Sequence, residues 1–95
     1  MKNLIVSATV LAKLQDKHHV TRREVEQCFE NKCGTYLIDD REEHGTDPPT
    51  LWFVSVTNQG RTLKVVFIFL DGNVHLKTAY EPTPQVVGLY DDLGR

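Results

Sequence analysis

The sequence predicts an α+β domain: two N-terminal helices packed on a three- to four-stranded antiparallel meander, followed by a short C-terminal helix. Two patterns point to this fold class. Apolar residues recur at helical spacing in the first third of the chain, and the rest holds β-branched and aromatic runs separated by turn residues. With 95 residues the chain is long enough for one modest core, so residues 1–95 are taken as a single domain.

The first helix is predicted from Ala8 to about His18. Ser7 precedes it as the N-cap, because a serine oxygen accepts a hydrogen bond from the first helical turn. One stripe follows the i, i+3/i+4 spacing of a buried helix face: Val10, Leu11, Leu14 and His18.

The second helix is predicted to begin at a capping box, with Thr21 as the N-cap and the Glu24 side chain reaching back to it. It runs to about Asn31, and Gly34 is expected to end it because glycine readily closes a helix C-terminus. Its apolar face holds Val25, Cys28 and Phe29.

Strands are expected over residues 35–39, 51–57, 62–70 and 74–80. Residues 58–61 are interpreted as a hairpin turn, and Asp71-Gly72 as a two-residue type I′ turn. A closing helix is predicted over residues 84–90, since Thr83-Pro84 is typical of an N-cap followed by a first-turn proline.

These turns predict a register. The Asp71-Gly72 turn sets four pairs: Phe69 with Val74, Ile68 with His75, Phe67 with Leu76, and Val66 with Lys77. A two-residue tip at Gln59-Gly60 sets Val56 opposite Leu63, Ser55 opposite Lys64, and Val54 opposite Val65.

Alternation then predicts two faces. One is wholly apolar and should face the helices: Trp52, Val54, Val56, Leu63, Val65, Phe67, Phe69, Val74 and Leu76. The other is mixed: Phe53, Ser55, Thr57, Thr62, Lys64, Val66, Ile68, His75 and Lys77. Three hypotheses account for this mixed face: the C-terminal segment covers it through Val86, Val87 and Tyr90, a partner protein binds it, or it is a catalytic or RNA-binding surface.

The charge balance excludes a strongly basic nucleic-acid binder, since the net charge is −2. Acidic residues are concentrated in residues 39–49, a loop that also holds Arg41 and His44. This loop could be solvated, bind a hard cation, dock a basic partner or supply a general acid or base through His44.

No zinc or cofactor site is expected, because Cys28 and Cys33 are followed by no second ligand pair and Cys28 lies on an apolar helix face. We find no signal peptide and no apolar run long enough to span a membrane, so a cytoplasmic location is expected. Motifs for an activated nucleophile, a phosphate-binding loop or a metalloprotease are absent from the sequence.

Short stretches of the sequence resemble the BrnT toxins of the RelE/ParE-like superfamily. Lys17-His18-His19-Val20 is similar to the family's K-H-G-V stretch, residues 60–67 to its G-R-x-L-x-V-V-[FY] strand, and residues 75–79 to its R-I-I-S-A strand. The resemblance implies a RelE-like fold and a ribonuclease toxin that cleaves mRNA at the ribosome and is neutralised by a ribbon-helix-helix antitoxin. His75 stands where the family has an arginine, and Tyr80-Glu81 where it has Arg-Ala.

The chain is also similar to short bacterial proteins labelled ADP-ribosyl-(dinitrogen reductase) hydrolase. The shared stretches are residues 25–29, residues 39–53 and Gly60-Arg61-Thr62-Leu63-Lys64. Enzymes that carry that name are all-helical and much longer, so hydrolysis of ADP-ribose is the remotest of the functions considered.

Two main hypotheses follow. In the first, the chain is a toxin-like, metal-independent ribonuclease of a toxin–antitoxin module, with Lys64, Lys77, His75 and His18 as catalytic residues. In the second, it is a non-catalytic protein-binding module on the same fold, which the lost family arginines favour. RNA- or partner-binding residues are then Lys17, Arg61, Ser55, Phe53, Arg41 and His44. Partners are an antitoxin or other protein, RNA or the ribosome; a homodimer is left open.

Overall fold

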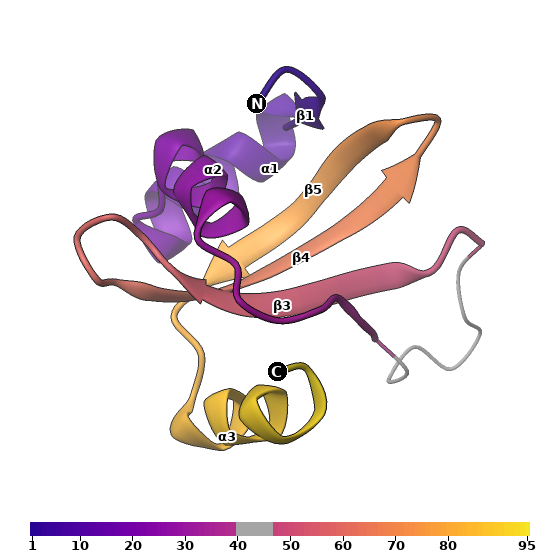
Figure 1. The fold of residues 1–95 in the computed structure, drawn as a ribbon. Helices are drawn as coiled ribbons and strands as arrows, with labels where there is room; N and C mark the ends of the chain where they lie inside the picture. The colour runs from indigo at the N-terminus through magenta and orange to yellow at the C-terminus, as the bar shows by residue number, and fades with distance from the viewer. Residues whose placement is uncertain (40–46) are drawn as a thin grey trace.

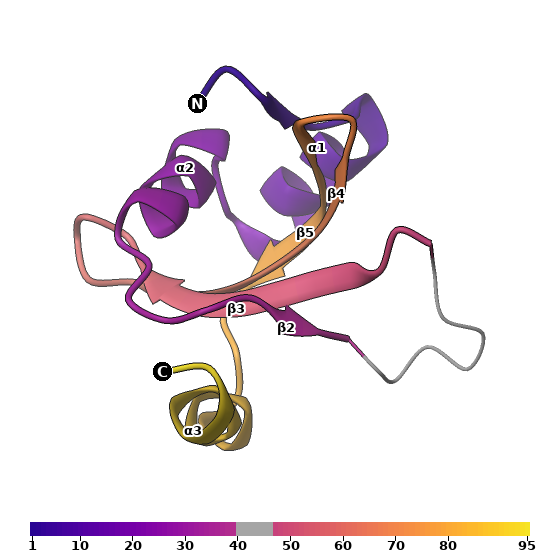
Figure 2. The ribbon, with the colours of Figure 1, turned by 45° about the vertical axis from the view of Figure 1, so that its right-hand side comes forward.

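The computed structural model describes residues 1–39 and 47–95. In chain order its elements are β1 (Leu4–Ile5), α1 (Ala8–Lys13), the π-helix η1 (Leu14–His18), α2 (Arg22–Glu30), β2 (Leu37–Ile38), β3 (Thr50–Val56), β4 (Thr62–Leu70), β5 (Asn73–Tyr80) and α3 (Pro84–Leu93). The described strands form one mixed sheet in the order β1-β5-β4-β3-β2. The N-terminal helices lie on one face of this sheet and α3 on the other, which confirms the α+β class (Figures 1 and 2).

The first helix spans the predicted range but changes its winding. Ser7 Oγ accepts from the Val10 N–H at 3.2 Å, as predicted for the N-cap. The second half of the helix, η1, is π-helical and ends at His19, which adopts a left-handed conformation with φ 53°. Single π-helical turns often lie next to functional residues.

The second helix confirms the capping box, in which Thr21 and Glu24 bond each other's backbone N–H groups at 3.1 Å. The prediction that Gly34 ends this helix was wrong. Asn31 is the C-cap, and its N–H bonds the Gln27 carbonyl at 2.8 Å. Gly34 instead packs against the end of α3.

The sheet has one more strand than predicted, at the N-terminus. β1 pairs in parallel with β5, which makes the sheet mixed rather than antiparallel. The pairing includes a hydrogen bond of 2.8 Å from the Val74 N–H to the Asn3 carbonyl. A strand of two residues is too short to show the alternation by which strands are found in a sequence.

The predicted register between β4 and β5 is correct only near the turn. Asp71 and Gly72 both have positive φ, as a type I′ turn requires, and Phe69, Ile68 and Phe67 oppose their predicted partners. A β-bulge then interrupts the ladder between Val66 and Phe67. As a result Val66 opposes Thr78, not Lys77.

The predicted register between β3 and β4 was wrong by one residue. The connection is a three-residue loop closed by a 2.9 Å hydrogen bond from the Thr57 N–H to the Arg61 carbonyl, with Gly60 at φ +84°. Val56 therefore opposes Thr62 rather than Leu63. Because side chains alternate across a strand, this shift turns every β3 residue to the face opposite to the predicted one.

The corrected register redistributes the side chains. The α1–α2 face holds Leu51, Phe53, Ser55, Leu63, Val65, Phe67, Phe69, Val74, Leu76 and Ala79. The α3 face holds Thr50, Trp52, Val54, Thr62, Lys64, Val66, Ile68, His75, Lys77, Thr78 and Tyr80. The main core lies between the sheet and the N-terminal helices, where Leu14, Val20, Val25 and Cys28 are completely buried.

The C-terminal segment covers part of the α3 face, as one of the three hypotheses for that face held. Thr83 is the N-cap of α3 and accepts from the Val86 N–H. The fully buried Tyr90 lies 5.8 Å from the Trp52 ring, between ring centroids. Within the described ranges, no helix has the length and apolarity needed to cross a bilayer.

Candidate functional site

Lys64 lies under α3 and is the most unusual charged residue of the sheet. The residue is 3% exposed, and its Nζ lies 4.6 Å from the centroid of the Trp52 ring and 5.9 Å from that of Tyr80. Across residues 1–39 and 47–95, Lys64 has neither an ion pair nor a hydrogen bond from its amine. Among the described residues, the neighbours of the Lys64 amine that interact with its charge are the Trp52 and Tyr80 rings.

The Lys64 amine keeps contact with solvent although its stem is buried. In the described part of the chain, Ser55 Oγ is the one fully buried side-chain nitrogen or oxygen atom that lacks a hydrogen-bond partner. The Lys64 Nζ atom also lacks such a partner among these residues, so it is not fully buried and keeps some contact with solvent. Placing a lysine where water is scarce without an acidic partner is unfavourable, and cation–π contacts return only about 0.5–2 kcal/mol. A position of this kind suits a negatively charged ligand.

The β-bulge places Tyr80 beside Lys64. If β5 alternated regularly after His75, Tyr80 would point to the α1–α2 face. The extra residue at the bulge instead brings Tyr80 directly opposite Lys64 and onto the α3 face. Bulges are known to re-aim side chains next to functional sites.

His18 joins this arrangement at the edge of β5. Its ring lies 5.5 Å from the Tyr80 ring, between centroids. Burial, together with the nearby charges of Lys17 and His19, lowers the pKa of His18 below its usual value. A neutral imidazole at physiological pH can accept a proton, so His18 meets the protonation requirement of a general base. We call Trp52, Lys64, Tyr80 and His18 the Lys64 row.

The other two predicted catalytic residues lie farther along the sheet. His75 opposes Ile68, which in turn opposes Thr50 on the far side. Lys77 Nζ lies 3.4 Å from Thr50 Oγ1, so the lysine reaches across the sheet from β5 to β3. Lys64 is thus linked to His18 only through the Tyr80 ring, which contacts both, whereas His75 and Lys77 lie farther along the α3 face.

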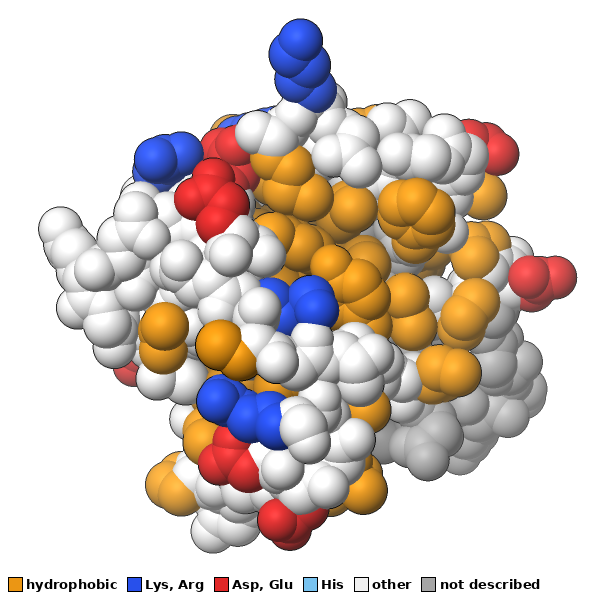
Figure 3. Space-filling model, viewed as in Figure 1, with side chains coloured by type: hydrophobic (Ala, Val, Ile, Leu, Met, Phe, Trp, Pro, Cys, Tyr) orange, Lys and Arg blue, Asp and Glu red, His pale blue; other side chains and the backbone are white. Residues whose placement is uncertain are grey.

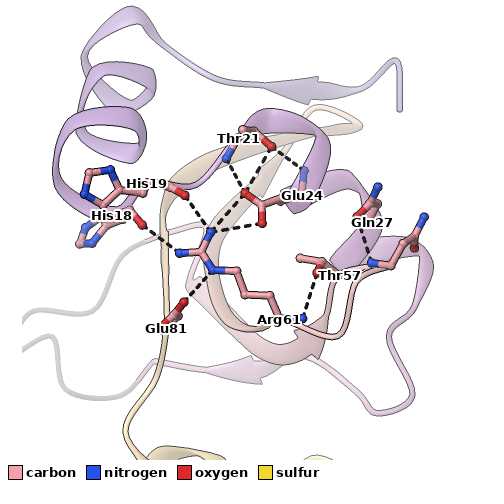
Figure 4. A network of polar contacts seen from close by, with 9 residues as sticks. His18, His19, Thr21, Glu24, Gln27, Thr57, Arg61 and Glu81 are labelled. Atoms are coloured by element: carbon pink, nitrogen blue, oxygen red, sulfur yellow. Dashed lines mark hydrogen bonds and ion pairs between the residues drawn. The ribbon is translucent and has the colours of Figure 1, made fainter.

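Arg61 is engaged inside the protein, as Figure 4 shows. Its NH1 donates to the His19 carbonyl at 2.7 Å, and its NH2 donates to the His18 carbonyl at 3.0 Å. NH1 also contacts the Glu24 carboxylate at 3.2 Å, and Nε contacts Glu81 at 2.7 Å. The hydrogen bond to Glu81, followed by the hydrogen bond to Glu24 and the charges of both carboxylates, raises the pKa of Arg61 against the opposing effect of burial. The side chain closes the C-terminal end of η1 and joins it to α2 and to the end of β5.

We predict that Arg61→Met lowers the free energy of unfolding by about 2 kcal/mol, because two backbone carbonyls and Glu24 would lose a charged donor. The loss is modest because the Arg61 side chain is 26% exposed and its charge is partly screened by water. Urea denaturation measures the change. Arg23→Met, at an exposed position of α2, is the control and should change stability by less than about 0.5 kcal/mol. Equal losses of stability in the two variants would contradict the role of Arg61 in joining η1 to α2 and to the end of β5.

Phe53 and Ser55 do not lie on the exposed surface for which they were predicted. Phe53 is completely buried under α2, with its ring centroid 4.8 Å from that of Phe29. Ser55 is 4% exposed and lines a small cavity of about 80 Å³ near Asn31 and Cys33. Both predictions depended on the incorrect β3 register. Lys17 is exposed next to His18, whereas Arg41 and His44 lie outside the described residues.

The two thiols have different surroundings. Cys28 is buried in the core, and desolvation raises its pKa to about 12, so the thiol stays protonated. Cys33 is exposed. Within the described residues, no three His, Cys, Asp or Glu side chains are grouped as a metal site would require.

Comparison with known proteins adds no relative. No family model matches the chain, and neither a curated protein nor a solved structure matches it significantly. The roles of Trp52 and Tyr80 were missed in the sequence, because both follow from the hairpin loop and the bulge. The glycine at the third position of the Asn58-Gln59-Gly60 loop was the one available signal.

Proposed function

We propose that this chain is a toxin-like protein of a two-gene module that cleaves RNA without a metal ion. The observation that carries the proposal is Lys64, a nearly buried lysine with no acidic partner in the described ranges, held between Trp52 and Tyr80 next to His18. A ribonuclease needs a cation where negative charge develops at phosphorus, and Lys64 is suited to that role.

In the proposed reaction one side chain accepts a proton and another stabilises the developing negative charge. His18, neutral at physiological pH because its pKa is lowered, accepts the proton of the ribose 2′-hydroxyl as that oxygen attacks phosphorus. The P–O5′ bond breaks, the 5′-oxygen leaves with a proton taken from water, and the other product is a 2′,3′-cyclic phosphate. Lys64 stabilises the extra negative charge of the transition state. Tyr80 is half-buried, and its aromatic ring is a group on which a base of single-stranded RNA can stack. Lys77 and His75 lie farther along the same strand and face.

The fold supports the proposal through the resemblance described above. Two N-terminal helices on one sheet face and a cationic opposite face are compatible with a RelE-like architecture. In such a module the physiological partner is a ribbon-helix-helix antitoxin, and the target is mRNA on the ribosome. A short neighbouring gene for a ribbon-helix-helix protein would support this assignment without any biochemical work.

We predict that Lys64→Met abolishes RNA cleavage with little loss of stability. Methionine keeps the volume of the buried stem but removes the charge, and loss of such a cation lowers the cleavage rate by about 10²–10³-fold. The measurement is inducible expression of wild type and variant, followed by growth and by mRNA integrity. Lys64→Arg, which retains the charge, should restore part of the activity.

The control is Lys13→Met on α1, an exposed lysine of the opposite layer, which should leave toxicity unchanged. Wild-type expression with normal growth and intact mRNA would refute the ribonuclease. Toxicity that survives Lys64→Met would refute the site while leaving the activity in place.

A second function, a non-catalytic protein-binding module, is favoured by one observation. Arg61, the arginine of the strand most similar to the toxin family, has its guanidinium engaged with Glu24, Glu81 and two backbone carbonyls. A charge used in this way is not available to RNA. The mixed α+β fold gives no support to the third function, hydrolysis of ADP-ribose, whose enzymes are all-helical.

A further inference from the structure

We propose that the open part of the α1–α2 face binds an amphipathic helix of a partner protein. The N-terminal helices cover only part of that face. Beside them lies a groove of about 330 Å³ lined by Met1, Asn3, Tyr36, Leu51, Phe67, Phe69 and Val74. In Figure 3 a hollow lined by hydrophobic side chains lies between the N-terminal helices and the outer end of the sheet. This proposal does not depend on Trp52, Lys64 and Tyr80, which lie on the opposite face of the sheet.

The exposed apolar side chains of the groove are large. Phe69 is 52% exposed, Tyr36 is 40% exposed, and Ile38, which opposes the groove residue Leu51, is 63% exposed. Contiguous apolar surface of this kind marks binding sites in soluble proteins.

A helix fits this groove better than a strand does. Most of the lining side chains project from β3, β4 and β5, which are the inner strands of the sheet. At the level of the groove the edge strands are β1 and β2, which pair with Val74 and Leu51 and are only two residues long. A strand added beside them would leave the inner strands uncovered. A helix laid beside α2 would complete the helical layer that covers this face (Figure 2).

The charges around the groove determine which charged residues the partner helix should carry and at which end. Among residues 1–39 and 47–95, no charged side chain lines the groove, and the Met1 amine is paired with Glu26 at 2.7 Å, so the contact face of the partner must be uncharged. At one end Lys32 lies 4.6 Å from the Tyr36 ring centroid. At the other end Asp71 begins the β4–β5 turn, two residues after Phe69. The partner helix therefore carries its acidic end near Lys32 and its basic end near Asp71.

This orientation also suits the helix dipole. The C-terminus of a helix carries partial negative charge and its N-terminus partial positive charge. A partner helix whose C-terminal end lies at Lys32 places both ends next to opposite charge. The complementary peptide thus has basic residues at its N-terminus and acidic residues at its C-terminus.

The test uses two fluorescein-labelled peptides of about 18 residues on an alanine-rich helical host. Each carries leucines at i, i+3, i+4 and i+7. One has lysines near the N-terminus and glutamates near the C-terminus; the other has these charges exchanged, together with end groups that leave helicity equal by circular dichroism. Fluorescence anisotropy measures binding to the whole chain. We expect the first peptide to bind at least about tenfold more tightly than the second.

Phe69→Thr should weaken binding of the first peptide by about tenfold. Leu89→Thr is the matched control, because Leu89 is 48% exposed but lies on α3. Equal affinity of the two peptides, or equal effects of the two variants, would overturn the proposal. So would a dimer in solution that Phe69→Thr dissociates, because the groove would then belong to a second copy of the chain. Light scattering of the wild type and Phe69→Thr decides this last outcome.

Discussion

Phe53→Ala is expected to lower the free energy of unfolding by about 3–5 kcal/mol, the range for removing a buried phenylalanine ring from a core. Phe53 is completely buried, with its ring centroid 5.4 Å from that of Tyr36 and 6.1 Å from that of Phe67. Because a domain of this size has roughly 5–15 kcal/mol of stability, the variant should be close to unfolding at physiological temperature. Thermal and urea denaturation followed by circular dichroism measure the loss.

The matched control is Phe69→Ala, the same substitution on the same sheet face. Phe69 is 52% exposed, so its loss should change stability by less than about 1 kcal/mol. The comparison is also a test of register. If β3 and β4 were joined by a two-residue turn, Phe53 would lie on the α3 face outside the main core. A small effect of Phe53→Ala would then indicate that the Val56–Thr62 pairing is incorrect.

Gly34→Ala is expected to lower the free energy of unfolding by about 3 kcal/mol, at the upper end of the range for overpacking. A Cβ atom at this position would lie 2.4 Å from the Gly94 carbonyl oxygen and 2.6 Å from the Tyr90 hydroxyl oxygen. The backbone there holds α3 in place. The Thr35 N–H donates to the Gly94 carbonyl at 2.7 Å, and the Tyr90 hydroxyl donates to the Thr35 carbonyl at 2.7 Å. Alanine must separate these groups.

Tryptophan fluorescence can show whether α3 detaches before the rest of the domain unfolds. Trp52 is the single tryptophan of the chain, and its ring lies against Tyr90. Gly88→Ala is the control, because Gly88 lies within α3 with open space around it. There alanine should raise stability by about 0.5–1 kcal/mol through helix propensity. A Gly34→Ala protein as stable as the wild type would show that the chain does not approach α3 this closely.

The sequence was sufficient to predict those features that depend on residues only a few positions apart. The Thr21–Glu24 capping box, the Ser7 and Thr83 caps and the Asp71-Gly72 turn are all present as predicted. Each works through a side chain and the backbone of the same turn, so no knowledge of the rest of the fold is needed. The α+β class and the three longer strands were also predicted from local sequence patterns, and the charges of the candidate residues follow directly from their residue types.

Tertiary structure decided how these elements face one another. One extra residue in the loop before Gly60 turned β3 over and exchanged Phe53 and Ser55 for Trp52 and Val54 on the α3 face. One bulge brought Tyr80 to Lys64. The partners of Arg61 come from His18, His19, Glu24 and Glu81, which lie 20 to 43 residues away along the chain. Local sequence determines turns and caps because their energies are local. Register, bulges and ion pairs between distant residues depend on which surfaces are buried together, and that is settled only when the whole chain packs.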